Sequence, residues 1–168
     1  YKENIIEDVE KYIEIIYLKT GKLFEASALV AMDVAERTDT DWARDFGKNF
    51  GIAYQLRNDY LDYFGDDNQT GKNIAEDLSE GKSTLPLIHS YINSNVNDKI
   101  TLENIFDKKI VSDTDELREI FYRNKSDKYT LEKIEKYSNN AIKALESLDS
   151  GYSKTLTELT KFCSTRPR

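Results

Sequence analysis

The sequence predicts an all-α fold: a helical bundle without a domain boundary. Apolar residues recur at steps of three and four along almost the whole chain, which is the spacing of one buried helix face. There is no β-hairpin signal and no internal repeat, and the 168 residues include only two prolines. A chain of this length suffices for one domain with a core, and folding buries roughly 70% of its unfolded surface.

Three helices are expected in the first 64 residues. The first follows a stripe of apolar positions, which are Ile5, Ile6, Val9, Tyr12, Ile13, Ile16 and Tyr17. The second runs from about Leu23 to Glu36 and is rich in small residues that allow helices to pack closely. The third runs from about Asp41 to Phe64, with Asp39 or Thr40 as its N-cap.

Gly47 and Gly51 lie about one turn apart in the third helix. A glycine inside a helix costs about 1 kcal/mol relative to alanine. We therefore expect another helix or a ligand to approach the backbone closely at these two positions.

A polar loop is expected from Gly65 to Ser83, and ordered loops of this length are often functional. Thr84-Leu85-Pro86 then opens a helix, because proline is tolerated in the first turn. Three more helices are expected, at Leu117–Tyr122, Leu131–Leu148 and Leu156–Phe162. The second of these carries a core-facing stripe, made of Leu131, Ile134, Tyr137, Ala141, Leu145 and Leu148.

Composition limits the class of protein. There are 31 acidic and 24 basic side chains, and the formal charge of −7 argues against general nucleic-acid binding. No apolar stretch approaches the roughly 18 residues that a membrane span needs, and no signal peptide opens the chain. Cys163 is the only cysteine, so a reducing cytoplasm is the expected compartment. The only methionine is Met32, which suggests that an N-terminal portion is missing.

The segment that carries chemistry lies at the end of the third helix. With about 100° between residues, five oxygen-bearing side chains share one helix face: Gln55, Asn58, Asp59, Asp62 and Asp66. Carboxylates near a helix C-terminus are unfavourable unless a cation compensates them. Hard oxygen ligands of this kind suit Mg²⁺.

Lysines accompany this acidic face. Lys72 and Lys82 lie in the loop that follows it, and Lys19 lies upstream in Tyr17-Leu18-Lys19-Thr20. Carboxylates with nearby lysines fit a phosphate or diphosphate bridged by a metal better than a bare metal site. The alternative is an acidic, solvated helix end followed by a charged loop.

The order and spacing of these motifs resemble the trans-polyprenyl diphosphate synthases. The matching motifs are Lys19-Thr20 with Leu23-Phe24-Glu25-Ala26, Phe46-Gly47, Gly51-Ile52-Ala53-Tyr54-Gln55, Asn58-Asp59-Tyr60-Leu61-Asp62-Tyr63, Gly65-Asp66, Gly71-Lys72 and Asp77-Leu78-Ser79-Glu80-Gly81-Lys82-Ser83-Thr84-Leu85-Pro86-Leu87. An Asp-x-x-Asp pair alone would be a weak signal, but the ordered set over about Tyr17–Leu87 is specific. The remaining helices are compatible with this family.

The resemblance implies a helical bundle of the isoprenoid synthase type and a prenyltransferase activity. Such enzymes condense isopentenyl diphosphate with an allylic diphosphate. Mg²⁺ ions held between two aspartate-rich motifs help the allylic diphosphate to ionise, the isopentenyl double bond attacks the allylic carbocation, and proton loss restores an alkene.

The resemblance also implies roles for individual residues. Asp59, Asp62 and Asn58 would bind Mg²⁺, directly or through water. The diphosphate would be contacted by Lys19 and Lys72, and with a less certain role by Lys82. Thr20 and Gln55 match positions that line the carbocation and direct proton loss, so Lys19, Thr20 and Gln55 are the predicted catalytic residues.

Two departures from the family pattern matter. Asn58 stands where the family has aspartate, which removes one charge from the predicted metal site. No first aspartate-rich motif precedes Lys19-Thr20. We therefore expect residues 1–168 to be the C-terminal part of a single polyprenyl synthase domain, inactive alone, with a homodimer, or a heteromer with the missing half or another subunit, as the assembled form.

Three alternatives remain open. The chain could be a non-catalytic or regulatory subunit of a heteromeric prenyl diphosphate synthase, which Asn58 favours slightly. Asn58, Asp62 and Asp66 also faintly resemble the metal triad of class I terpene synthases. A purely structural helical protein is the third, although it would not need an acidic face beside ordered lysines.

Overall fold

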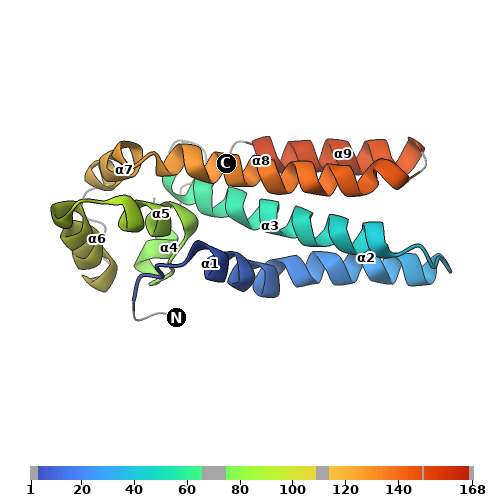
Figure 1. Ribbon diagram of the computed structural model, residues 1–168, viewed down its shortest axis with the longest axis horizontal. Helices are drawn as coiled ribbons and strands as arrows, with labels where there is room; N and C mark the ends of the chain where they lie inside the picture. The colour runs from blue at the N-terminus through green and yellow to red at the C-terminus, as the bar shows by residue number, and fades with distance from the viewer. Residues whose placement is uncertain (1–3, 66–74, 109–113, 149, 167–168) are drawn as a thin grey trace. The chain divides into compact units, whose positions relative to one another are not determined.

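The computed structural model describes residues 4–65, 75–108, 114–148 and 150–166. These residues form helices and connecting turns, and no strand occurs among them (Figure 1). The elements are α1 (Val9–Ile16), η1 (Tyr17–Gly21), α2 (Lys22–Val34), α3 (Asp41–Phe64), α4 (Glu76–Ser79), α5 (Leu85–Asn93), α6 (Val96–Lys108), α7 (Thr114–Arg123), α8 (Ser126–Ala144), η2 (Leu145–Ser147) and α9 (Ser150–Thr165). The all-α prediction is confirmed. None of the described helices combines the length and apolar character needed to cross a lipid bilayer.

The chain divides into two compact units, which are described separately. Unit 1 contains Tyr1–Tyr12 and Asn58–Leu131, together with the last two residues. Unit 2 contains Ile13–Arg57 and Glu132–Arg166. Helix α3 therefore contributes its first four turns to unit 2 and its last turns to unit 1.

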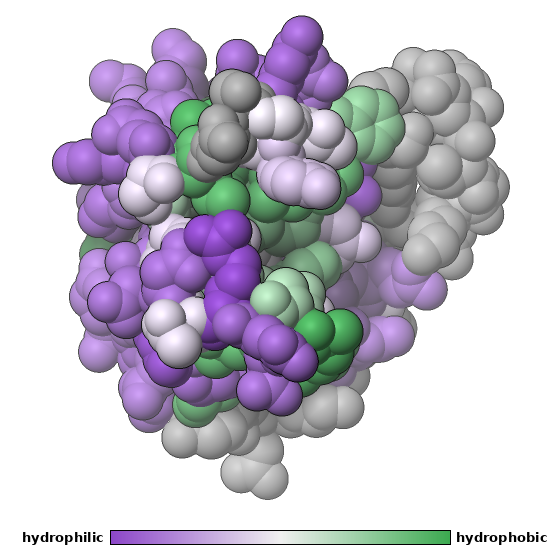
Figure 2. Space-filling model, turned by 90° about the vertical axis from the view of Figure 1, so that its right-hand side faces the viewer, coloured by the Kyte–Doolittle hydropathy of each residue, from purple (hydrophilic) through white to green (hydrophobic). Residues whose placement is uncertain are grey.

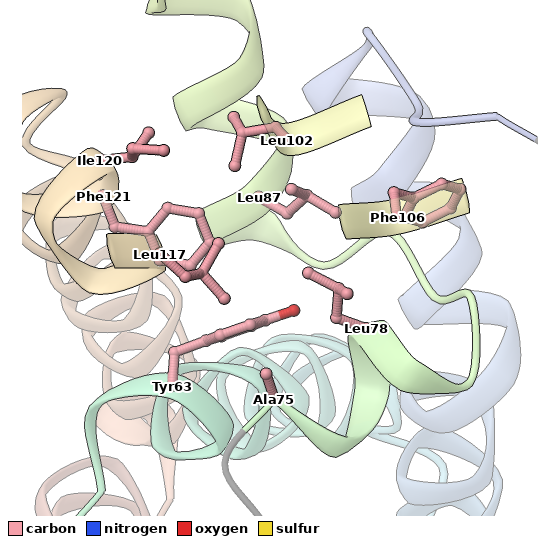
Figure 3. Packing of buried hydrophobic residues seen from close by; sticks show 9 residues of the cluster. All are labelled: Tyr63, Ala75, Leu78, Leu87, Leu102, Phe106, Leu117, Ile120 and Phe121. Atoms are coloured by element: carbon pink, nitrogen blue, oxygen red, sulfur yellow. The ribbon is translucent and has the colours of Figure 1, made fainter. Parts of the chain in front are cut away.

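Unit 1 has a core formed by the end of α3 and by α4 to α7 (Figure 3). Its buried members are Tyr63, Ala75, Leu78, Leu87, Leu102, Phe106, Leu117, Ile120 and Phe121. The Tyr63 side chain reaches from α3 into the middle of this cluster, and its ring meets Phe121 edge-on at 5.1 Å between centroids. This core holds the C-terminal end of α3 against the segment that follows the predicted loop.

Unit 2 has a second core, to which α2, α3, α8 and α9 contribute. Its buried members are Phe46, Phe50, Ala141, Leu145 and Cys163, with Phe24, Trp42, Tyr54, Ala144, Leu148 and Leu156 packed around them. The Phe24 ring meets Phe50 edge-on at 5.0 Å. Aromatic pairs of this geometry contribute beyond the area that they bury.

Gly47 and Gly51 mark a close approach of helices within unit 2. A Cβ at Gly47 would lie 2.6 Å from the Glu25 Cα, and one at Gly51 would lie 2.6 Å from the Gly21 Cα. Both distances are too short for any side chain to fit against a backbone. The predicted close approach is confirmed, and the approaching partners are η1 and the first turn of α2.

Several helix bounds differ from the predictions: α1 begins only at Val9, after Ile5 and Ile6, and α8 and α9 begin five and six residues before the predicted starts at Leu131 and Leu156. Helix α3 has the predicted bounds, and Thr40 occupies its N-cap position, with its carbonyl accepting the Arg44 N–H. Asp39, the other candidate cap, is instead paired with Arg37. Leu131 was predicted to face the core but is exposed, because the buried face of α8 passes through Thr130, Ile134 and Ser138, and Leu131 lies beside it.

Two helices lie where none was predicted. Short α4 falls inside the predicted loop, of which residues 66–74 lie outside the described part of the chain. Helix α6 was missed because its exposed positions include Val96 and Ile100, which blur the apolar period. Its N-terminus carries a reciprocal cap: the Asp98 N–H bonds the Asn95 side chain, and the Asn95 amide bonds the Asp98 carboxylate. This Asn-x-x-Asp signal could have revealed α6.

Helix α2 leaves an apolar stripe exposed in unit 2. Leu23, Val30 and Val34 are 70%, 61% and 79% exposed, and their spacing places them on one face. Figure 2 looks onto the end of the molecule where α2 ends and α3 begins, and shows apolar surface interleaved with hydrophilic surface there. Stripes of this kind usually mark a surface that another molecule or segment covers.

Candidate active site

Lys19 and Thr20 lie on a π-helical turn. Element η1 directly continues α1, and the Lys22 N–H bonds the Tyr17 carbonyl five residues earlier. Single π-helical turns inserted in α-helices are rare and occur often at functional sites. The extra residue turns Lys19 and Thr20 relative to the faces that a regular α-helix would present, and Lys19 is exposed.

Thr20 and Gln55 are brought together within unit 2. The Thr20 hydroxyl donates a hydrogen bond of 2.9 Å to Gln55 Oε1, and both side chains are half-buried. The pair joins η1 to α3 near the close contact of Gly21 with Gly51. With its proton directed to Gln55, the Thr20 oxygen presents its lone pairs elsewhere.

A buried carboxylate braces this π-helical turn. Glu25 is 4% exposed and accepts a hydrogen bond of 2.5 Å from the Tyr17 hydroxyl. It is also paired with Lys22 at 3.1 Å and with Arg44 at 3.3 Å. The hydrogen bond from Tyr17, aided by these two cations, holds the pKa of Glu25 below its ordinary value against the opposing effect of burial. Sequence analysis included Glu25 only as part of a family motif and assigned its partner Tyr17 to an apolar helix face.

Asn58, Asp59 and Asp62 lie on the last two turns of α3, in unit 1. Asn58 is half-buried, whereas Asp59 and Asp62 are only 3% and 8% exposed. The alternative of a solvated acidic face is therefore wrong for these two carboxylates. Asp66, the fifth member of the predicted face, lies outside the described residues.

Asp59 is bound by a tyrosine. The Tyr12 hydroxyl, on α1, donates a hydrogen bond to Asp59 Oδ2, and both groups are buried. Burial and the neighbouring charge of Asp59 raise the pKa of Tyr12 well above its ordinary value, so the hydroxyl keeps the proton that it donates. Sequence reasoning placed Tyr12 in an apolar stripe. No sequence signal links it to a carboxylate 47 residues away.

Asp62 is bound by backbone amides. Its two carboxylate oxygens accept the N–H groups of Glu76 and Asp77, each at 3.2 Å, and its carbonyl accepts the Ala75 N–H at 3.0 Å. Asp62 thereby caps the start of α4. The chain leaving the predicted loop is in this way tied back to α3.

A side-chain cation, the Arg118 guanidinium, binds the C-terminus of α3. The Arg118 guanidinium, from α7, donates to the carbonyls of Tyr63 at 2.8 Å and Gly65 at 3.4 Å. A cation that bonds the last carbonyls of a helix offsets the partial negative charge there. Part of the compensation that the sequence assigned to a metal therefore comes from a side chain far along the chain.

The two predicted loop lysines have different outcomes. Lys72 lies outside the described residues. Lys82 is paired with Asp77 at 2.8 Å and with Glu80 at 2.5 Å. Partial burial opposes its charged form, but the hydrogen bonds to these carboxylates raise the pKa of Lys82 above its ordinary value. A diphosphate would have to compete with both carboxylates for Lys82.

The donor set on α3 is compatible with Mg²⁺. Asn58, Asp59 and Asp62 offer amide and carboxylate oxygens, which are the ligands that Mg²⁺ prefers. Over the described ranges, no three His, Cys, Asp or Glu side chains gather closely enough to form a metal cage by themselves. Mg²⁺ usually binds one or two carboxylates together with substrate phosphates, so the residues present fit that mode.

Comparisons with known proteins identify the family. The sequence model of the polyprenyl synthetase family matches residues 1–123. Octaprenyl diphosphate synthase of Haemophilus influenzae is 33% identical over 152 residues, which cover 88% of this chain and 46% of that protein. All-trans-nonaprenyl-diphosphate synthase (geranyl-diphosphate specific) of Rhodobacter capsulatus is 31% identical over 168 residues, which cover 99% of this chain and 51% of that protein.

Solved structures share the fold. A polyprenyl synthase from Caulobacter crescentus CB15, in complex with calcium and isoprenyl diphosphate, matches with a TM-score of 0.89 at 29% identity, over 99% of this chain and 52% of that one. Geranylgeranyl pyrophosphate synthetase from Pyrococcus horikoshii Ot3 matches with a TM-score of 0.87 at 34% identity, over 98% and 51%. The chain spans about half the length of the curated relatives it matches. With its all-α fold and with a family match over residues 1–123 of 168, the chain belongs to the polyprenyl synthetase family.

Proposed function

We propose that the protein containing this chain is a trans-prenyltransferase that condenses isopentenyl diphosphate with an allylic diphosphate. The observation that carries the proposal is the composition of one face of α3, where Gln55 precedes Asn58, Asp59 and Asp62 in the order of the family motif. Relatives named as octaprenyl and nonaprenyl diphosphate synthases support the reaction type. The Caulobacter crescentus complex with calcium and isoprenyl diphosphate supports a divalent cation with a diphosphate ligand.

In the proposed reaction the bond between the allylic carbon and the diphosphate oxygen breaks, and the electron pair leaves with the diphosphate. The isopentenyl double bond attacks the allylic carbon, which leaves a positive charge on the isopentenyl unit. Loss of a proton from the carbon next to that charge restores an alkene. Mg²⁺, when bound by Asn58, Asp59 and Asp62, would neutralise the diphosphate and make it a better leaving group.

The chain's own residues have separate roles in this proposal. Exposed Lys19 would contact diphosphate oxygens, with Lys72 and Lys82 as further predicted contacts. The Thr20 hydroxyl, oriented by Gln55, would direct its oxygen lone pairs toward the developing allylic cation. The same oxygen would accept or relay the proton that leaves.

The proposal includes assembly and location. Residues 1–168 would be the C-terminal part of a single polyprenyl synthase domain, with the first aspartate-rich motif supplied by further chain. The complete protein would act in the cytoplasm as a homodimer or together with another subunit. The exposed stripe of Leu23, Val30 and Val34 supports association with a further segment or copy.

The test is incorporation of labelled isopentenyl diphosphate into farnesyl or geranyl diphosphate with Mg²⁺, for the chain alone and for the chain completed with its upstream coding region. We expect product only from the completed form, and D59N should lower the rate about 10²-fold or more. D45N is the matched control, because Asp45 is an exposed carboxylate on the same helix.

A second candidate, a regulatory subunit, is favoured by Asn58 in place of an aspartate. It predicts a folded, completed protein that forms no product by itself but changes the rate or product length of an active partner. In that case N58D should raise the Mg²⁺ affinity of this protein, but the activity of the partner should not depend on that substitution. Product formation by the completed wild-type protein would eliminate this candidate.

A further inference from the structure

The two aspartates of the α3 motif are bound in different ways. The carboxylate of Asp62 accepts two backbone N–H groups, which no side-chain substitution can remove. The carboxylate of Asp59 accepts a hydrogen bond from a side chain, the Tyr12 hydroxyl, and a substitution can remove that bond. All of these residues belong to unit 1.

The Tyr12 side chain is held in place by burial. Tyr12 is 2% exposed, so packing on all sides limits the movement of its ring and of the hydroxyl that donates to Asp59.

This arrangement restricts the orientation of Asp59. The terminal torsion of an aspartate is soft, and a carboxylate without a directional bond samples a broad range of angles. A hydrogen bond to one carboxylate oxygen from a buried side chain narrows that range. A ligand oxygen that is already oriented binds a metal without first losing that freedom, which is why residues behind metal ligands affect affinity strongly.

We propose that Tyr12 is a positioning residue, which orients the Asp59 carboxylate for a divalent cation bound with a diphosphate. This inference rests on the proposed function, because it assigns a purpose to Asp59. Tyr12 itself would not contact the substrate, and it would act only through Asp59.

The test compares two tyrosines that make the same kind of bond. Y12F removes the hydroxyl that bonds Asp59 on α3, whereas Y91F removes the hydroxyl of Tyr91 on α5 that bonds Glu103 on α6. Calorimetric titration of Mg²⁺ in the presence of inorganic pyrophosphate, on the completed protein, reads metal affinity without turnover. We expect Y12F to weaken the apparent Mg²⁺ affinity about 10–100-fold and Y91F to leave it unchanged.

A double-mutant cycle shows whether Tyr12 acts through Asp59. In the D59N background, Y12F should cause no further loss of Mg²⁺ affinity, because the group that it orients is already altered. An equal loss in both backgrounds would overturn the proposal. So would a folded Y12F protein with wild-type affinity, or a Y12F protein that does not fold, since its hydroxyl would then be purely structural.

The proposed function can fail separately. A folded wild-type protein that binds no Mg²⁺ with pyrophosphate would contradict the prenyltransferase proposal, and the role of Tyr12 would be lost with it. Wild-type binding combined with an unaffected Y12F would leave the proposed function intact and overturn the role of Tyr12 alone.

Discussion

Single carboxylates in this chain have very different surroundings. A hydrogen bond from Tyr17 lowers the pKa of Glu25, and a hydrogen bond from Arg37 lowers the pKa of Asp39. Glu25 is buried, whereas the Arg37–Asp39 pair is exposed on both sides. Exposed ion pairs contribute little to stability, and buried hydrogen-bonded charges are costly to disrupt.

The first prediction follows from this contrast. E25Q should lower the free energy of unfolding by about 1–3 kcal/mol at neutral pH, because Tyr17 loses a charged acceptor inside unit 2. The folded pKa of Glu25 lies below the unfolded value of about 4.3. Its stabilisation is therefore complete above that value and is lost as the pH falls through the folded pKa. Urea unfolding of both proteins at pH 7 and in acid measures the difference.

The matched control is D39N, which removes the exposed carboxylate with the same direction of pKa shift. It should change stability much less than E25Q. A wild-type advantage over E25Q that stayed constant on acidification would contradict the assignment of the effect to the charge of Glu25.

The second prediction concerns glycine. G47A should destabilise unit 2 by about 1–3 kcal/mol through overpacking, although alanine is the better helix former. The new Cβ would meet backbone atoms of Glu25 and Phe24 within 2.8 Å, and backbone atoms cannot move aside. G151A is the control, because a Cβ there meets nothing within 4 Å, and it should stabilise by about 0.4–1 kcal/mol. Thermal unfolding of the two variants should therefore shift in opposite directions.

Among the elements, α3 shows how a helix end depends on a distant residue. The bonds from Arg118 to the Tyr63 and Gly65 carbonyls occupy the last turn of α3, next to the turn that carries Asp59 and Asp62. Without this guanidinium, the partial negative charge of the helix end would add to that of the two carboxylates.

The third prediction tests this cap. R118M should lower the free energy of unfolding by about 1–2 kcal/mol, and R118K should lose less because the positive charge remains. K128M is the control for removing a surface cation, since Lys128 is exposed on α8. Equal stability of R118M and wild type in urea unfolding would show that the α3 carbonyls do not need the cap.

The packing of η1 explains why the Lys19-Thr20 motif is followed by a glycine, Gly21. The π-helical turn needs one extra residue in the same length of helix, and Gly21 lets that turn lie against Gly51. A side chain at Gly51 would meet the Gly21 backbone and separate the two helices, whereas one at Gly21 would meet the Tyr17 ring at 2.8 Å. In the Lys19-Thr20-Gly21 segment, Gly21 therefore serves helix packing, and Lys19 and Thr20 serve the proposed site.

At the scale of the whole molecule, the exposed stripe of Leu23, Val30 and Val34 is one apolar surface that packing within the described chain leaves uncovered. The end-on view in Figure 2 shows apolar surface reaching solvent at the end where α2 stops. We expect the 168-residue chain alone to self-associate through such surface.

The fourth prediction measures this association. Sedimentation velocity of the chain alone should show species larger than a monomer, and L23K with V34K should shift the distribution toward the monomer. V96K is the control, because Val96 is an exposed apolar residue on α6 in unit 1. A wild-type chain that sediments as a clean monomer, unfolds cooperatively and binds little apolar dye would contradict the prediction.

Much of the fold was predictable because local patterns determine helices. The apolar period marked α3 to its exact bounds, proline in the first turn marked α5, and paired glycines marked a close helix contact. Helix α6 was missed because two of its five apolar residues, Val96 and Ile100, are exposed, and α4 was missed because four residues are too few to establish a period. The motif order also identified the family, since a specific order of rare motifs carries more information than composition.

What the sequence by itself determined is the helical class and the family, and it predicts a set of residues that bind a metal and a diphosphate. Tertiary structure alone decided which partners those residues have. Tyr12 meets Asp59 across 47 positions, Arg118 reaches the carbonyl of Tyr63 across 55, and Asp62 bonds the amides that begin α4. The physical reason is that periodicity arises from neighbours a few residues apart, whereas a hydrogen bond between distant residues exists only after the helices have packed.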